Sequence, residues 1–282
     1  MRKKGFLIAT VLFMVGCFTS AGAEEVVVAP YKPDSPSASL SNTDLAPIDI
    51  EKLKSGQAAL NVGHYNQLPP FYYADDNVQP GFGHDIFMEV AKKAGIQHIN
   101  WIGFDYGADL NAQLEQGKID LIANSWDLPG AREQFLLTTP YYTKGGLSFL
   151  YFKKNGPFLT ADDLKDHAVG VFRYGYADRY WLPAHNVAKG SIKTYPTIRD
   201  LMFALRDGEV DVAVVYYPLA QLAQQQLVDK LEATLVQPIN DVYAVRKQDA
   251  ALQTLLNQAI HNLATEGTLN KIQAQYINSP PP

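Results

Sequence analysis

Residues 114–123 read LEQGKIDLIA, and residues 205–214 repeat the same pattern as LRDGEVDVAV. Each copy has a leucine, two polar residues, a glycine, a charged residue, a β-branched residue, an aspartate and an apolar run. Glycine at Gly117 and Gly208 suits the left-handed position that ends a helix, and the apolar run is typical of a buried strand. The repeat favours two similar α/β lobes; chance recurrence of a common helix-to-strand junction is the alternative.

The sequence around the first copy predicts an alternation of strands and helices. Spacing of apolar residues predicts strands at 60–63, 98–101 and 119–123, and helices at 81–95 and 110–116. This order implies a mostly parallel sheet with crossover helices. Ligands bind beyond the carboxyl ends of such strands, so two lobes with facing strand ends would share one cleft.

The N-terminus is typical of a secretory signal peptide over residues 1–23. A basic start, MRKK, precedes an apolar run at 5–16 and a small-residue Ala-Gly-Ala cleavage pattern. We therefore expect a periplasmic protein; lipidation at Cys17, whose context loosely resembles a lipoprotein box, is the alternative. Cleavage after Ala23 removes the only cysteine, so the mature chain would have no disulfide, thiol nucleophile or thiolate metal site.

Composition limits the possible partners. The chain has 282 residues and a formal net charge of −5, and loss of the basic signal makes the mature chain more acidic. An acidic surface argues against nucleic acid and anionic lipid as partners. Residues 24–58 are rich in Pro, Ser and Asp and predict a flexible leader with a short helix near 50–54, or a segment packed along the domain surface.

Several ordered motifs between residues 60 and 277 carry a resemblance to a known family. They are LNVGHYNQLPPFYY, GFGHDIFMEVAKKAG, GKIDLIANSWDLPGAREQFLLTTPYYT, LTADDLKDHAVGV and LATEGTLNKIQAQY. In this order they resemble the periplasmic solute-binding proteins of amino-acid-type ABC importers, the bacterial extracellular solute-binding protein family 3. The resemblance implies a small-molecule ligand, a membrane permease as partner, a monomer and no cofactor.

The fold implied by the resemblance is α/β, the two-lobed type II periplasmic-binding-protein fold with a central ligand cleft. Lobe 1 would comprise residues 59–143 plus 239–278, and lobe 2 residues 149–234. Two crossing strands would form a hinge near Lys144–Ser148 and Val236–Pro238. Closure about such a hinge traps ligand between the lobes.

The resemblance also implies a ligand-binding residue, Arg132, at the position of the family arginine that clamps a carboxylate. A guanidinium makes two parallel bonds to a planar anion; an exposed arginine at the start of a helix is the other interpretation. The family threonine falls on Pro129, and two family aspartates that hold an ammonium group fall on Tyr65 and Tyr216. Asp127 is a candidate for the missing anion, or it caps the following helix. Replacement of the two ammonium-binding carboxylates by phenols argues against a standard α-amino acid, and the expected ligand is a small polar solute that is amino-acid-like or an organic acid.

Aromatic residues dominate the expected cleft, because aromatic faces grip flat or cationic groups. The candidates are Tyr65, Trp126, Tyr174, Tyr176 and Tyr216, with core packing as the alternative for each and a structural role expected for Phe71. Arg173 is expected to join Arg132 in binding an acidic ligand, or else to pair with Asp178.

Three classes of function remain at this point, and a transport-linked binding protein that is not an enzyme is the expectation. A sensory or accessory binder shares the fold. A cyclohexadienyl-dehydratase-like lyase also shares it and would need a general acid, for which Asp127 and His64 are the candidates. No catalytic triad, phosphate loop or His/Cys metal cluster is visible in the spacing, so no catalytic or metal residue is expected.

Overall fold

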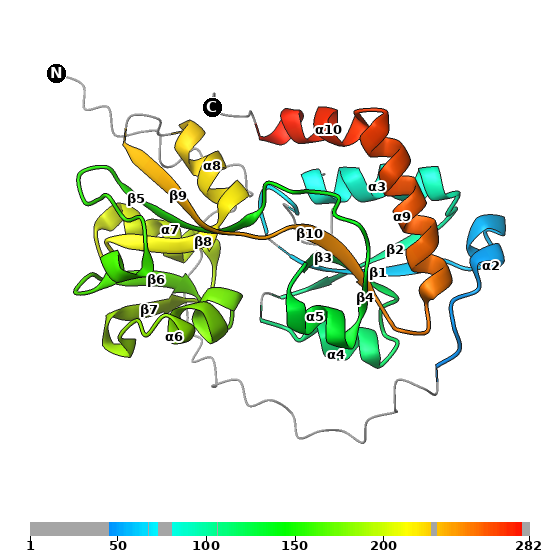
Figure 1. Cartoon of the computed structure of the whole chain (residues 1–282), viewed down its shortest axis with the longest axis horizontal. Coiled ribbons are helices and arrows are strands. Elements are labelled where there is room, and N and C mark those ends of the chain that lie inside the picture. Colours follow the sequence, from blue (N-terminus) through cyan, green and yellow to red (C-terminus); the bar gives the residue numbers. More distant parts are fainter. Residues whose placement is uncertain (1–44, 67, 73–80, 106, 227–229, 278–282) are drawn as a thin grey trace, which may run out of the picture.

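A computed structural model describes residues 45–66, 68–72, 81–105, 107–226 and 230–277, which form two α/β lobes side by side (Figure 1). The two-lobed fold expected from the sequence is confirmed. The signal-peptide prediction for residues 1–23, with Cys17, lies outside the described residues. Within the described part of the chain, helices are all too short or too polar to cross a membrane.

Lobe 1 is built on a five-stranded sheet with the order β2-β1-β3-β10-β4. Its strands are β1 (Leu60–Tyr65), β2 (Ile99–Phe104), β3 (Leu121–Trp126), β4 (Leu136–Leu137) and β10 (Asp241–Val245). β1 pairs in parallel with β2 and β3, whereas β10 is antiparallel to β3 and β4. The sheet is thus mostly parallel, as predicted, and β10 is the antiparallel exception because this strand re-enters lobe 1 directly from lobe 2 without a crossover helix.

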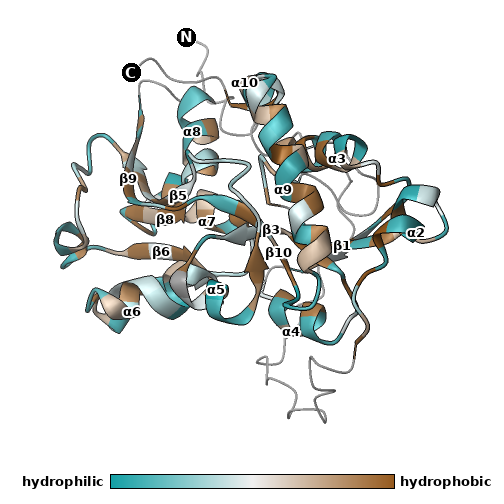
Figure 2. Ribbon diagram, turned by 45° about the vertical axis from the view of Figure 1, so that its right-hand side comes forward, coloured by the Kyte–Doolittle hydropathy of each residue, from teal (hydrophilic) through white to brown (hydrophobic). Residues whose placement is uncertain are grey.

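Two layers of helices cover the lobe 1 sheet, one on each face. Successive side chains of β10 point to opposite faces and therefore pack against different helix layers. Tyr243 and Val245 belong to a core with α3 (Phe82–Ala94), α9 (Ala250–Thr265) and α10 (Thr268–Tyr276). Val242 and Ala244 point to the opposite face, where α4 (Leu110–Glu115) and α5 (Pro129–Gln134) lie. Figure 2 shows hydrophobic residues concentrated on the strands between these helix layers.

Lobe 2 repeats this architecture with the order β7-β6-β8-β5-β9. The strands are β5 (Gly146–Phe152), β6 (Val169–Phe172), β7 (Ile192–Tyr195), β8 (Val212–Tyr216) and β9 (Leu231–Pro238). The helices are η1 (Ala161–Leu164), η2 (Ala177–Trp181), α6 (Leu182–Ala184), η3 (Lys189–Ser191), α7 (Ile198–Asp207) and α8 (Tyr217–Gln226). α7 and α8 pack on one face of the sheet, and η2 and α6 pack on the other.

The internal repeat of the sequence occupies equivalent places in the two lobes. The first copy joins α4 to β3 and the second joins α7 to β8. Gly117 has a φ of 71° and Gly208 a φ of 77°, the left-handed conformation that the sequence predicts at each helix end. Each repeat therefore leads into a strand that ends facing the other lobe.

Two chain crossings join the lobes, one from β4 to β5 and the other from β9 to β10. The crossings touch, because a Cβ on Gly146, whose φ is 132°, would overlap the carbonyl oxygen of Gln237. A Cβ on Gly145 would likewise overlap the carboxylate of Asp241. The first crossing therefore needs glycine for backbone approach as well as for conformation.

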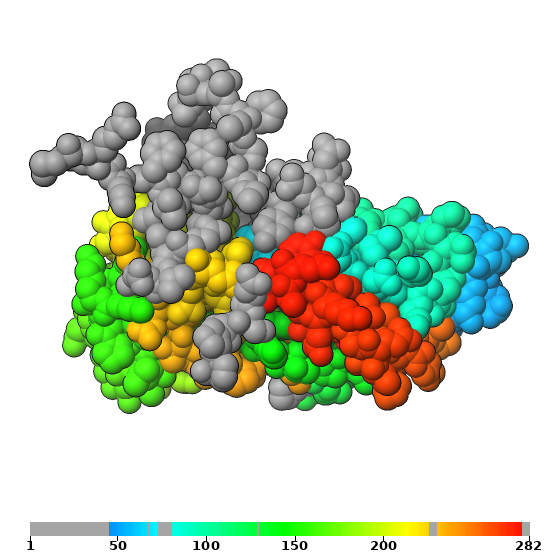
Figure 3. Space-filling view, turned by 90° about the horizontal axis from the view of Figure 1, so that it is seen from above, coloured from blue at the N-terminus to red at the C-terminus, as the bar shows by residue number. Residues whose placement is uncertain are grey.

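The end of the predicted leader is part of lobe 1. Residues 45–58 include α2 (Ile50–Ser55), the short helix that the sequence suggested, and Leu53 in it is buried in the core. The backbone N–H of Ile48 donates to Asp249 over 2.9 Å. Figure 3 shows α2, in blue, at the end of lobe 1 farthest from lobe 2. The flexible-leader interpretation is corrected for residues 45–58, because apolar residues anchor them.

Candidate functional site

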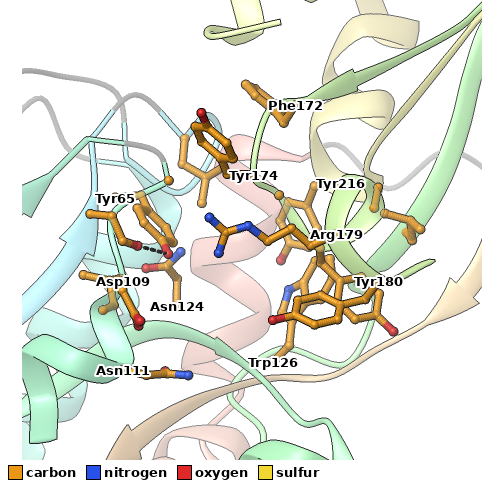
Figure 4. Close-up of a pocket in the computed structure, with 18 of the residues that line it drawn as sticks. Tyr65, Asp109, Asn111, Asn124, Trp126, Phe172, Tyr174, Arg179, Tyr180 and Tyr216 are labelled. Carbon is orange, nitrogen blue, oxygen red and sulfur yellow. Dashed lines mark hydrogen bonds between the residues drawn. The ribbon is translucent and has the colours of Figure 1, made fainter. Parts of the chain in front are cut away.

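A cavity of about 520 Å³ lies between the lobes and is lined by residues of both. Its walls come from the ends of β1, β3, β6 and β8, as expected for ligand sites at the carboxyl ends of strands. The first residue of β10, the start of α4 and the turn η2 also contribute lining residues. The volume falls in the range of small-molecule sites, about 300–1,000 Å³. Figure 4 shows the side chains converging from both sides.

Aromatic rings form a continuous contact across the cavity. Trp126 of lobe 1 lies 5.3 Å from Tyr176 and 5.6 Å from Tyr216 of lobe 2, measured between ring centroids. Phe71 of lobe 1 lies 5.0 Å from Tyr216. The structure therefore brings Trp126, Tyr176 and Tyr216 together, as the sequence analysis expected. Phe71 is 1% exposed, which accords with a mainly structural role.

Tyr65 and Tyr174 also line the cavity. The phenol of Tyr65 donates to the carbonyl of Ala108 over 3.0 Å. Tyr174 has a φ of 64°, and its ring lies against Gly107 of lobe 1, where a Cβ would come within 3.1 Å of Cδ2. The two lobes are thus in contact at the cavity wall as well as at the hinge.

Asp127 and Arg132 are adjacent to each other but do not line the cavity. Asp127 accepts two hydrogen bonds of 2.6 Å from the Arg132 guanidinium, whose side chain is 56% exposed. This bond raises the pKa of Arg132. The N-cap of α5 is Leu128, so Asp127 does not cap the helix. The prediction that Arg132 binds an anionic group of the ligand is corrected, because its guanidinium is paired with the Asp127 carboxylate outside the cavity wall.

Arg173 also lies outside the cavity wall. Asp178, its alternative partner, instead accepts the backbone N–H of Tyr174 over 2.7 Å. The guanidinium that enters the cavity belongs to Arg179, on the π-helical turn η2. It lies 5.2 Å from the Tyr174 ring centroid and points from lobe 2 toward Tyr65 and Asn124 (Figure 4).

Sequence reasoning missed Arg179 for a local reason. Residues 172–180 read FRYGYADRY and contain two arginines, of which the sequence analysis proposed Arg173 as a ligand contact and left out Arg179. Gly175 donates to the carbonyl of Phe172, and Arg179 donates its backbone N–H to Gly175, so a tight turn precedes η2. This turn directs Arg179 into the cavity. Arg179 lies four residues after Gly175, one helical turn, and this spacing was the signal in the sequence that both residues would face the same side.

Asp241, at the start of β10, is a second cavity residue that the sequence analysis missed. The residue is 1% exposed, and its Oδ2 accepts a 2.6 Å hydrogen bond from the phenol of Tyr216. Burial raises the pKa of Asp241 well above its usual range, against the opposing effect of its hydrogen bonds to Tyr216 and Trp126. The signal available in the sequence was an acidic residue at the second lobe crossing.

His64, a candidate proton donor, is held within lobe 1 and is absent from the cavity lining. Its ring stacks on Tyr72 at 4.6 Å and meets Trp101 edge-on at 5.6 Å. Burial lowers its pKa. Neither His64 nor Asp127 therefore faces the space where a substrate would sit. Across the described residues, no group of three His, Cys, Asp or Glu side chains could hold a metal ion.

Comparisons with known proteins agree with this architecture. Residues 60–279 match the family described as bacterial extracellular solute-binding proteins, family 3. A probable amino-acid-binding protein of Bacillus subtilis, YxeM, is 26% identical, with 80% of this chain and 86% of that protein covered. The L-cystine-binding protein TcyJ of Escherichia coli K12 is 29% identical, with 82% and 86% covered.

A solved structure shows the same fold. It is an ABC uptake transporter substrate-binding protein from Streptococcus pneumoniae with bound histidine. The TM-score is 0.69 at 22% identity, covering 81% of this chain and 96% of that one. At this identity the likeness concerns the fold, and it leaves the ligand of the present cavity to be argued from its own residues.

Proposed function

The chain belongs to the bacterial extracellular solute-binding proteins of family 3, and on that premise we propose that it captures a small polar solute between its lobes for an ABC-type importer. The solute is amino-acid-like or an organic acid. Closure of the lobes about the two crossings would enclose it. We place this function in the periplasm, reached through the signal peptide, with a membrane permease as the partner that receives the solute.

The observation that carries this proposal is the cavity itself. It lies between the lobes, is lined by both and has the volume of a small-molecule site. A solute there would touch Trp126 of lobe 1 together with Tyr176 and Tyr216 of lobe 2, so its binding would favour the closed arrangement.

Arg179 is our candidate for the contact to an anionic group of the solute. Its guanidinium enters the cavity, and within the described part of the chain no carboxylate forms an ion pair with it. Arg132, by contrast, is satisfied by Asp127 at the surface. A planar guanidinium suits a carboxylate because it donates two parallel bonds. The aromatic walls would hold the remainder of the solute.

Binding without chemical conversion is the function that the site supports better than lyase activity. The two expected proton donors, His64 and Asp127, both lie outside the cavity wall. The relatives named above are also described as binding proteins. A sensory role would use the same cavity, and it differs from import only in the membrane partner.

The test combines a thermal-shift screen with mass spectrometry and small-angle X-ray scattering. We expect at least one amino acid or organic acid to raise the melting temperature, to be recovered unchanged and to reduce the radius of gyration. Recovery of a new product would show that the protein is an enzyme that converts the compound, and not a binding protein. The absence of stabilisation and of closure with every compound would contradict the proposal. Genes for a permease and an ATPase beside this gene would support import, whereas a receptor gene would support sensing.

A further inference from the structure

The hinge places a carboxyl group, that of Asp241, in the wall of the cavity. Its backbone N–H donates to the carbonyl of Tyr142 over 2.9 Å, and its own carbonyl accepts the N–H of Tyr141 over 3.1 Å. These bonds tie the second lobe crossing to the first. The room for the side chain comes from Gly145, where a Cβ would overlap Oδ2. The carboxyl group is therefore held by the hinge backbone.

Residues of both lobes orient this carboxyl group. The phenol of Tyr216, at the end of β8 in lobe 2, donates to Oδ2 over 2.6 Å. The indole of Trp126, at the end of β3 in lobe 1, also hydrogen-bonds to the carboxyl group. Both rings line the same cavity, so Asp241 has aromatic surfaces beside it. This combination of a carboxylate and aromatic faces attracts cations.

Within the described residues no basic side chain forms an ion pair with Asp241, although the Arg179 guanidinium lines the same cavity. The titratable groups that interact with Asp241 are phenols. These phenols belong to Tyr72, Tyr141, Tyr142, Tyr216 and Tyr243. Burial without a cation raises the pKa of Asp241, so a cation that enters the cavity would find a carboxyl group whose ionisation it stabilises.

A second acceptor lines the same cavity. Oδ1 of Asn124, on β3, is buried and has no hydrogen-bond partner among the described residues. A buried acceptor without a donor costs about 1–3 kcal/mol. A ligand group with several N–H donors would satisfy Asn124, whereas a carboxylate or a hydrocarbon would not.

We propose that Asp241 anchors a protonated amine of the solute, with Arg179 binding its anionic group. This inference rests on the proposed function and narrows its solute class from amino-acid-like compounds and organic acids to those that carry an ammonium group. In the family pattern the carboxylates for this group fall on Tyr65 and Tyr216. Here Tyr216 instead donates to a carboxylate that the hinge supplies.

Asp109 offers a matched comparison, because it also lines the cavity but lies on its exposed side. Its side chain caps α4 by accepting the N–H of Ala112 over 3.1 Å, and asparagine would retain this capping. Asp109→Asn and Asp241→Asn therefore remove one cavity carboxylate each with little change of shape. A difference between the two variants would report on the position of the charge.

The experiment measures binding of the proteinogenic α-amino acids and of the α-hydroxy acids with the same side chains. In the wild type and in Asp109→Asn, at least one amino acid should bind tenfold or more tightly than its hydroxy acid. In Asp241→Asn this preference should fall below threefold. Calorimetry of the wild type in buffers of different ionisation enthalpy should show proton release on binding of the amino acid, because the cation displaces the proton of Asp241.

Other outcomes separate the two proposals. Retention of the preference in Asp241→Asn, or its loss in Asp109→Asn alone, would overturn the anchor and leave the proposed function intact. If the wild type bound each amino acid and its hydroxy acid with equal affinity and released no proton, the anchor would also be overturned and the proposed function would stand. This outcome does not depend on the folding of Asp241→Asn. Failure of every compound to bind the wild type would remove the proposed function as well.

Discussion

The phenol of Tyr216 donates a 2.6 Å hydrogen bond to Oδ2 of Asp241. Tyr216 ends β8 in lobe 2, and Asp241 begins β10 in lobe 1. The bond therefore crosses between lobes at the point where the chain itself crosses. It joins the wall of the cavity to the hinge, so a ligand that contacts either residue also acts on the connection between the lobes.

Removal of this bond should destabilise the protein measurably. We expect Tyr216→Phe to lower the free energy of unfolding by about 1–2 kcal/mol, because a buried carboxyl group loses a donor. In an Asp241→Asn background the loss should be smaller, since the amide offers one acceptor oxygen where the carboxyl group offers two. Urea unfolding of the two single variants and the double variant measures this coupling. Equal losses in both backgrounds would show that the phenol acts independently of Asp241.

The two guanidinium groups should differ in their effect on affinity. Arg179→Ala should weaken binding of an anionic solute by about 1.5–3 kcal/mol, because it removes charge-assisted bonds inside the cavity. Arg132→Ala should leave affinity within about threefold and stability within about 1 kcal/mol, as for an exposed ion pair. Isothermal titration calorimetry with the solute found by thermal shift gives both values. Equal losses of affinity would mean that Arg132 leaves Asp127 when the solute binds.

Two glycine substitutions test the packing of the hinge. Gly145→Ala should lower the free energy of unfolding by about 1–3 kcal/mol, because its Cβ would overlap the Asp241 carboxylate and approach the Ile239 carbonyl oxygen at 2.8 Å. Gly130→Ala, in α5, is the control: nothing lies within 4 Å of its Cβ. We expect this change to be neutral or slightly stabilising. Chemical denaturation compares the variants, and similar stabilities would contradict the close contact at Gly145.

The stability of the ligand-free protein should depend on pH through Asp241. Because burial raises the pKa of this carboxyl group in the folded state, the folded protein retains a proton that the unfolded chain loses above about pH 4. The stabilising contribution is thus complete below that pH and declines as the pH rises toward the folded-state pKa. Relative to the wild type, Asp241→Asn should therefore gain stability as the pH rises above about 4.

Urea unfolding at several pH values measures this difference. Asp162→Asn, which changes a carboxylate whose side chain is 83% exposed, provides the control and should follow the wild type. The phenols around Asp241 remain protonated in this range, because burial raises their pKa values further above 10. A constant difference between the wild type and Asp241→Asn would contradict the prediction.

Much of the fold could be predicted from local patterns. The glycine at each helix end, Gly117 and Gly208, has the left-handed φ that the repeat predicts, and each is followed by a buried strand. The aromatic residues Trp126, Tyr176 and Tyr216 were identified because they follow strands, whose ends converge in an α/β fold. Local periodicity identifies the strands, and the last residues of each strand lie at the end of the sheet to which it belongs. These features can therefore be predicted from short segments.

The charged residues of the site could not be predicted in the same way. Arg132 occupies the position that the family pattern indicates, yet its partner Asp127 lies five residues earlier and holds it at the surface. Arg179 and Asp241 reach the cavity through a tight turn and a lobe crossing, respectively. The direction of a side chain depends on which partner is closest in space, and a linear pattern does not contain that distance.

The sequence by itself determined the two α/β lobes, the strand ends that face each other and the aromatic character of the cleft, because the periods of helices and strands are properties of short segments. Tertiary structure decided the distribution of charge. It satisfied Arg132 with Asp127, directed Arg179 inward and placed Asp241 beside Tyr216, from the other lobe. Ion pairing and burial act between groups brought together by folding, so the chemistry of the cavity follows from contacts between segments far apart in the chain.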